Sequence, residues 1–105
     1  FDPDKAYQSL IDSGEQWADA EAAASLLEET RKSVLAKLMN ESAVASVAGK
    51  EMQALADPTY EAFVAGMVNA RAAANKAKVR YDSAKVLAEL RRSQEATRRS
   101  EMNLR

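Results

Sequence analysis

Apolar residues recur at alternating intervals of three and four along two long segments of the chain. With Arg31 as its one charged member, the first row consists of Trp17, Ala20, Ala24, Leu27, Arg31, Val34 and Leu38. The second row consists of Tyr60, Phe63, Met67, Ala70, Ala74, Ala77, Tyr81, Ala84 and Ala88. This spacing keeps side chains on one face of an α-helix and is typical of helices packed lengthwise against another helix. We therefore predict long helices over about 15–41 and 58–100.

Two Asp-Pro dipeptides mark the starts of helices. Asp2-Pro3 and Asp57-Pro58 each place an N-cap residue before a proline at the first helical position, where the missing N–H is not needed. Gly14 suits a helix C-terminus, and the segment Ser13–Gln16 has the form of a capping box. We therefore predict a separate short helix over about 3–12, which ends before the first long helix begins.

The segment between the long helices is rich in small residues and contains Gly49. Because glycine weakens a continuous helix, we predict a loop followed by a short linker helix over about 47–56. Val47, Met52 and Leu55 are expected to face inward from it.

The composition supports a helical protein. The chain has 22 alanines but only 3 glycines and 2 prolines, so good helix formers are common and helix breakers are scarce. We predict an all-α fold and a single domain over 1–105. Its architecture is an antiparallel helical hairpin or coiled coil with a short N-terminal helix and a short linker helix.

The hairpin predicts which residues meet. If Leu38 lies beside the segment 63–67, Trp17 faces about Ala84 to Ala88, and a large ring then packs against small residues. The residues predicted to form the helix–helix interface are Trp17, Leu27, Leu38, Phe63, Met67 and Tyr81.

A net charge of −1 hides a division along the chain. Residues 1–70 contain 5 basic and 12 acidic side chains, whereas residues 71–105 contain 10 basic and 4 acidic ones. In the hairpin, Glu21 is expected near Arg80, and Glu28 and Glu29 near the segment 71–76. Such flanking pairs contribute about 0.2–1 kcal/mol each and act mainly on orientation.

Beyond Leu90 the charges have no predicted partner on the first helix. We predict that a partner or nucleic acid contacts Arg91, Arg92, Arg98 and Arg99. Arginine suits phosphates and carboxylates, so the partner is a nucleic-acid backbone or an acidic protein surface. A third alternative is that Asp2, Asp4 and Asp12 neutralise this end. The segment after Leu90 has no aromatic residue to stack on bases, so any nucleic-acid contact is expected to be independent of sequence.

Catalysis is not expected. The chain has no Cys and no His, and it contains no nucleophile elbow, phosphate loop or zinc-protease motif. Its one adjacent acidic pair, Glu28-Glu29, points in directions about 100° apart on a helix. We predict no enzyme activity, no cofactor and no metal. The longest uncharged run, Ala62 to Ala70, is too short to span a membrane, and no leader opens the chain, so a cytoplasmic location is expected.

Five stretches of the chain resemble small helical proteins of tailed bacteriophages and prophages. These are Trp17–Ala22, Leu26–Thr30, Ala56–Tyr60, Ala74–Tyr81 and Arg98–Met102. Such proteins are usually uncharacterised and are often encoded near recombination or replication genes. The resemblance covers about Ser13 to Arg105, supplies no catalytic residues and implies a setting in phage DNA metabolism, in the cytoplasm of the host cell.

Together these observations predict a non-enzymatic phage accessory protein that acts through helical protein–protein contacts in a DNA transaction such as recombination or replication. One alternative is an inhibitor of a host nuclease or defence complex, with Asp19, Glu21, Glu28 and Glu29 imitating nucleic-acid charge. Another is a sequence-independent nucleic-acid binder that uses the basic C-terminal helix. The same rows of residues also allow a homodimer that buries a ridge of Val79, Val86 and Leu90.

Overall fold

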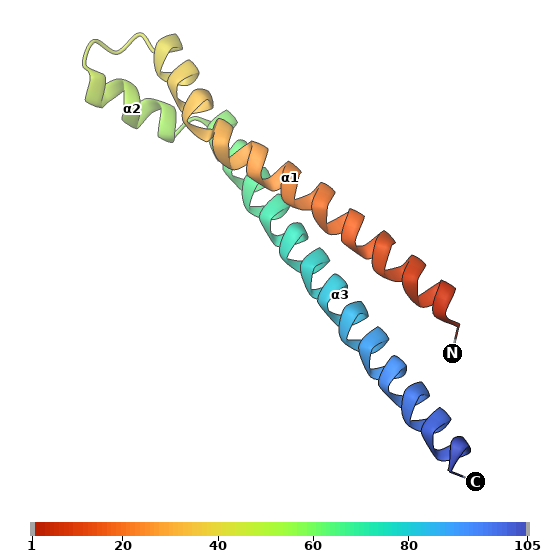
Figure 1. Ribbon diagram of the computed structural model, residues 1–105. Coiled ribbons are helices and arrows are strands. Elements are labelled where there is room, and N and C mark those ends of the chain that lie inside the picture. The colour runs from red at the N-terminus through yellow and green to blue at the C-terminus, as the bar shows by residue number, and fades with distance from the viewer. Residues whose placement is uncertain (1, 105) are drawn as a thin grey trace. The chain divides into compact units, whose positions relative to one another are not determined.

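The computed structural model describes residues 2–104 and consists of three helices. α1 spans Pro3–Glu41, α2 spans Val47–Leu55 and α3 spans Pro58–Asn103. α1 packs against α3 in the opposite direction, and α2 lies in the connection between them (Figure 1). The predicted all-α hairpin and its linker helix are confirmed. α2 ends one residue earlier than predicted, and α3 continues three residues further.

The predicted separate helix over 3–12 is wrong, because α1 runs without interruption through Ser13 and Gly14. The Ser13 hydroxyl donates to the carbonyl oxygens of Ser9 and Leu10, at 2.8 and 3.2 Å, rather than capping a new helix. Glycine inside a helix costs about 1 kcal/mol relative to alanine. A Cβ at Gly14 would lie only 3.2 Å from Cε1 of Tyr81, so the missing side chain gives the tyrosine ring its place.

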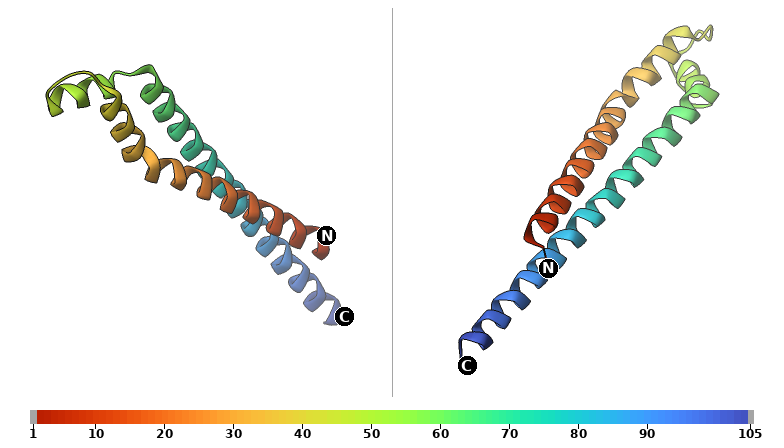
Figure 2. Two further views of the ribbon diagram at one scale, coloured as in Figure 1. Left: turned by 90° about the horizontal axis from the view of Figure 1, so that it is seen from above. Right: turned by 90° about the vertical axis from the view of Figure 1, so that its right-hand side faces the viewer.

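Residue contacts divide the chain into two compact units. The loop unit contains Ala20–Ala74, and the terminal unit contains Phe1–Asp19 and Asn75–Arg105. α1 and α3 contribute to both units, so each unit has an antiparallel pair of helical segments, and the loop unit also contains α2 (Figure 2). The single domain over 1–105 stays a prediction.

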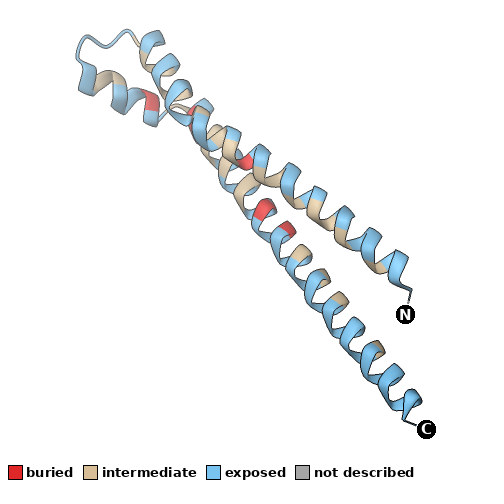
Figure 3. Ribbon diagram, in the orientation of Figure 1, coloured by how far each residue is buried: buried red, intermediate tan, exposed pale blue. Residues whose placement is uncertain are grey.

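Most of the buried residues are small. Within residues 2–104, the buried residues are Ala24, Ala54, Tyr60, Ala74 and Ala77 (Figure 3). All belong to the loop unit except Ala77. Because alanine leaves little beyond the backbone at the interface, the two helices approach closely and their backbones fill the space.

The inward face of α2 differs from the one predicted. Ala54 is the buried residue of this helix, while Val47 and Met52 are 73% and 72% exposed and Leu55 is also exposed. The side chain of Ser46 caps the helix by accepting a hydrogen bond from the Gly49 amide at 3.0 Å. The prediction placed the bulkiest residues of α2 on its buried face, whereas the small residue Ala54 is the one that is buried.

The alignment of α1 with α3 also differs from the predicted one, by about one helical turn. Trp17 lies beside Tyr81, not beside Ala84 to Ala88, with ring centroids 5.4 Å apart. Arg71 binds Glu21, for which Arg80 was the predicted neighbour. The predicted position of Glu28 beside the segment 71–76 is confirmed by its ion pair with Arg71. Two specific contacts set this alignment: the tyrosine ring fits over Gly14, and Arg71 reaches carboxylates on two turns of α1.

Leucine at position 74 is expected to destabilise the protein by about 1–2 kcal/mol, because Ala74 is fully buried and three added carbons have no space at a close helix contact. Urea denaturation followed by circular dichroism measures the change. The matched control is Ala73→Leu at the exposed neighbouring position, which should change stability by less than about 0.5 kcal/mol. Equal effects at both positions would contradict the close contact.

Candidate functional site

An aromatic contact holds α1 to α3 inside the terminal unit. The rings of Trp17 and Tyr81 are tilted by 33°, and Nζ of Lys78 lies 5.8 Å from the centre of the Trp17 ring. A cation at this distance from an indole face is attracted by its π electrons. Both aromatic residues are half-buried. From this contact toward the N-terminus of α1, the space between the two helices opens into a groove.

The groove has a volume of about 970 Å³, and its α1 wall is mostly apolar. Tyr7, Leu10 and Ile11 supply the bulky side chains of this wall, while Ala6, Gly14 and Ala18 supply small ones. Tyr7 is 71% exposed and Ile11 is 49% exposed, although both are large apolar residues on a surface that faces the groove. Exposed apolar side chains gathered along a concavity mark a surface that a partner can cover.

The α3 wall of the same groove is mostly charged. Tyr81 and Ala88 are its uncharged members, and the rest are Lys85, Glu89, Arg92, Glu95 and Arg99. Intervals of three and four residues place these five on one helix face, which continues the row that packs against α1. The groove therefore offers apolar contacts on one side and ordered charges on the other.

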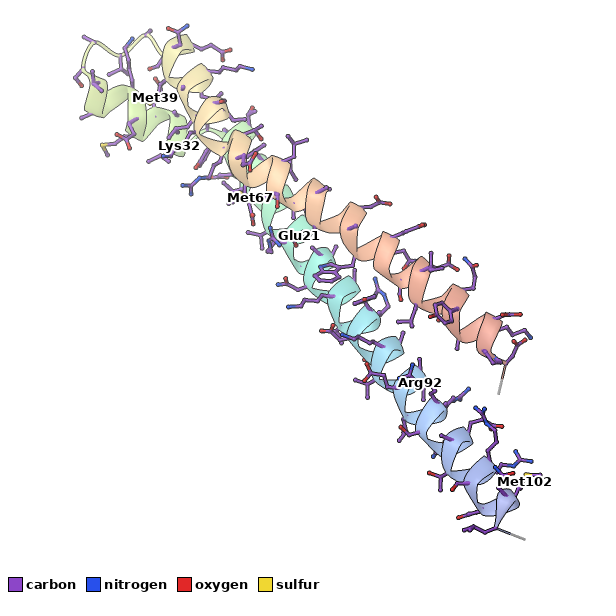
Figure 4. All side chains as sticks on the ribbon, viewed as in Figure 1. Glu21, Lys32, Met39, Met67, Arg92 and Met102 are labelled. Carbon is purple, nitrogen blue, oxygen red and sulfur yellow. The ribbon has the colours of Figure 1, made fainter. Side chains whose placement is uncertain are left out.

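The tail, which we define as residues 93–104, extends α3 beyond the reach of α1. Gly14 lies against Tyr81, so counting along the two antiparallel helices places Pro3 beside Arg92. The remaining 11 residues of α3 after Arg92 span roughly 16 Å and extend past the first turn of α1 (Figure 2), although Glu95 and Arg99 still line the groove. Figure 4 shows Met102 near the end of this tail, where its side chain is 65% exposed.

The two ion pairs among residues 2–104 belong to the loop unit, whereas the residues that line the groove belong to the terminal unit. Nη1 of Arg71 donates to Oε2 of Glu21 at 2.6 Å, while Nε and Nη2 donate to both carboxylate oxygens of Glu28 at 2.9 and 2.6 Å. Two parallel hydrogen bonds to one carboxylate form the bidentate contact for which the planar guanidinium group is suited. Because the two glutamates lie two turns apart on α1, this cluster fixes the alignment of the helices.

Comparison with protein-family models, curated proteins and solved structures finds no match to this chain. The resemblance to phage proteins therefore stays a prediction. The geometry of the groove and of the charged residues carries the functional argument.

The structure separates the four predicted contact arginines into two pairs. All four are exposed, but Arg92 and Arg99 line the groove whereas Arg91 and Arg98 do not. Within residues 2–104, no ion pair joins them to Asp2, Asp4 or Asp12. The predicted interface residues are all half-buried, and they are Trp17, Leu27, Leu38, Phe63, Met67 and Tyr81.

The described part of the chain contains neither a cluster of metal ligands nor a helix that could span a membrane. Among residues 2–104, no three acidic side chains come together in a way that could hold a metal ion. None of the three helices combines the length and apolar character needed to cross a membrane. The groove itself was not predicted from the sequence. Ala6, Gly14 and Ala18 lie eight and four residues apart, so these small residues share one helix face with Leu10 and leave room on either side of it.

Protonation of Glu28 at acidic pH is expected to lower the free energy of unfolding. The hydrogen bonds from Arg71, together with its charge, lower the pKa of the Glu28 carboxyl, although partial desolvation opposes the shift. The stabilisation is therefore complete above the ordinary glutamate pKa of about 4.3 and is lost as the pH falls through the lowered value. Urea midpoints measured between neutral and strongly acidic pH should fall more for the wild type than for Glu28→Gln.

The matched control for this measurement is Glu29→Gln. Glu29 is the exposed neighbour of Glu28 and takes no part in the Arg71 cluster. This variant should keep the pH dependence of the wild type. If Glu28→Gln and the wild type lose stability in parallel, the ion cluster does not contribute to folding in the way its geometry indicates.

Proposed function

We propose that this protein is a non-enzymatic interaction module that binds a helix of a protein partner in the groove of its terminal unit. One observation carries the proposal: Tyr7 and Ile11 are exposed large apolar residues on the wall of an open groove between two helices. A third helix is the element that such a groove accommodates, because its side chains can enter along both walls at once.

The two walls indicate how the third helix is held. Its apolar face covers Tyr7, Leu10 and Ile11 on α1, and this burial supplies most of the binding free energy. Its polar edge meets the charged wall of α3, which selects the partner and its direction rather than adding much affinity. This division of roles is typical of helix-in-groove recognition.

The wider role in the proposal comes from the resemblance described above. We propose an accessory role in a phage DNA transaction such as recombination or replication, exerted through protein–protein contacts. The proposal includes a cytoplasmic location, in the host cell if a phage encodes the chain.

A photo-crosslinking amino acid in place of Tyr7 tests the proposal. A benzophenone side chain there stands in the groove, so irradiation of the full chain, alone and in extract of the cells that express it, should give a product. Mass spectrometry should map the crosslink to residues three or four apart on a helical segment. The same amino acid at Gln8, the exposed neighbour outside the groove, is the matched control. Equal yields at positions 7 and 8 would refute a groove-bound helix.

A sequence-independent nucleic-acid binder is the second candidate, because Arg91 and Arg98 are exposed, lie outside the groove and share one face of α3. Replacing both with alanine should weaken retention of nucleic acid and reduce the salt dependence of binding by about two counterions. The double variant Arg31→Ala, Lys37→Ala on α1 removes the same charge from exposed positions elsewhere and is the control. No retention by the wild type at low salt would exclude this candidate.

The inhibitor alternative stays a prediction. Arg71 already binds Glu21 and Glu28, two of the four acidic residues that this alternative assigns to charge mimicry.

A further inference from the structure

The charges on the groove wall of α3 match a second copy of the same wall. In order along the helix they alternate in sign, at Lys85, Glu89, Arg92, Glu95 and Arg99. Two such helices can pair antiparallel about a two-fold axis beside Gln94. Each Arg92 then faces the other copy's Glu95, and each Glu89 faces the other copy's Arg99. Four pairs of opposite charge form, as the residue-for-residue reciprocity of a two-fold interface requires.

We infer that the groove of the terminal unit binds the tail of a second copy of this chain. The inference rests on the proposed function, because it names the helix that the groove holds. Each copy inserts its tail into the groove of the other, so the two tails are exchanged. The end of α3 that extends past α1 in one copy thereby gains α1 of the other copy as a neighbour.

The same two-fold axis brings apolar residues of the tail opposite apolar residues of the groove. Pairing about Gln94 places Met102 of the second copy opposite Lys85 and Val86. The contact between Gly14 and Tyr81 sets Leu10 beside Lys85, so Met102 of the second copy reaches Leu10 and its neighbour Ile11. Met102 is 65% exposed within its own copy, so the exchange removes apolar surface of both copies from water.

The mixed charge of the wall disfavours other occupants. A uniformly acidic helix would satisfy Arg92 and Arg99 but would meet Glu89 and Glu95 as like charges. A nucleic-acid backbone would encounter the same two carboxylates. A helix whose charges alternate with the opposite phase pairs with Glu89, Arg92, Glu95 and Arg99, and α3 itself carries that sequence of charges.

Charge reversal tests the inference on the full chain. Sedimentation equilibrium of the wild type should show a dimer at tens of micromolar. Either Arg99→Glu or Glu89→Arg alone turns two attractive pairs into two repulsive ones, because each substitution is present in both copies. The dissociation constant should rise at least about tenfold for each variant. Combining Arg99→Glu with Glu89→Arg restores opposite charges and should bring the constant back to within about threefold of the wild type.

The matched control is Arg98→Glu, which changes the same charge one residue away and outside the groove. It should leave the dissociation constant unchanged, and circular dichroism should show that all variants keep their helix content. A second control is Val79→Asp, in the exposed ridge that offers a different dimer interface. A dimer that Val79→Asp dissociates but Arg99→Glu does not would overturn tail exchange.

The crosslinking experiment separates this inference from the proposed function. A product between position 7 and the tail of another copy supports both. A wild-type monomer whose position 7 crosslinks to a helix of a different protein overturns tail exchange and leaves the proposed function standing. A monomer with no specific product at position 7 overturns both.

Discussion

Replacing Tyr60 with alanine is expected to lower the free energy of unfolding by about 3 kcal/mol. Tyr60 is 9% exposed and, among the buried residues of 2–104, is the one with a large side chain. The others are alanines, so none of them removes as much apolar surface from water as the Tyr60 ring does. Its removal leaves a cavity at the first turn of α3, where the helix is already supported by the Asp57 side chain accepting from the Thr59 amide at 2.8 Å.

Thermal unfolding followed by circular dichroism measures this effect, and a loss of this size corresponds to a fall in Tm of roughly 10 °C or more. Tyr60→Phe is the matched control because it keeps the ring and deletes only the hydroxyl. It should retain most of the stability of the wild type. If alanine and phenylalanine have equal effects, the hydroxyl rather than the burial of the ring stabilises the loop unit.

Replacing Trp17 with alanine is expected to cost about 2–3 kcal/mol in the terminal unit. The ring is half-buried, which reduces the loss below that of a fully buried tryptophan, but its contacts with Tyr81 and Lys78 are lost as well. Because the terminal unit has Ala77 as its one buried residue among those described, little else holds α1 to α3 there.

Hydrogen exchange gives the most direct measurement of the Trp17 substitution. Amide protection should fall over the α1 residues of the terminal unit and stay near the wild-type level around Ala24 in the loop unit, because local opening has its own free energy. Trp17→Phe keeps an aromatic ring beside Tyr81 and should lose less than half as much protection. A uniform loss over all of α1 would show that the two units unfold as one.

The sequence predicted the hairpin because the rows of positions three and four apart determine which face of each helix is buried. Ala24, Ala74 and Ala77 belong to these rows and are buried. The same rows could not determine which residue meets which, since a shift of one helix along the other keeps every row in contact. The alignment therefore depended on individual contacts, and Tyr81 over Gly14 could not be distinguished from Tyr81 elsewhere.

The boundary at Ser13 and Gly14 was mispredicted for a related reason. Both residues favour a helix end when local signals decide the structure. In the folded chain, Ser13 bonds back to the preceding turn and Gly14 makes room for a ring from α3, which lies 67 positions away in the sequence. A tertiary contact thus outweighs the local cost of glycine in a helix.

The candidate site was predictable in part. The arginines after Leu90 stand out in the sequence, but the sequence does not separate those that line the groove from those that do not until α1 is placed beside α3. The alternation of sign from Lys85 to Arg99 was readable as a pattern. Its meaning depends on the exposed Tyr7 and Ile11 on the opposite wall, which only the packing of the helices reveals.

The contacts of Arg71 select one alignment of α1 along α3. Alanines that recur every seven residues pack almost as well after one helix slides along the other by a heptad, a translation of roughly 10.5 Å. Glu21 and Glu28 are separated by this same interval, so such a slide leaves Arg71 with one carboxylate in place of two. After removal of Glu21 or Glu28, Arg71 has one carboxylate in the native alignment and also after a slide in one of the two directions. The arginine thus selects one alignment from a series that the alanines alone leave nearly equal in energy.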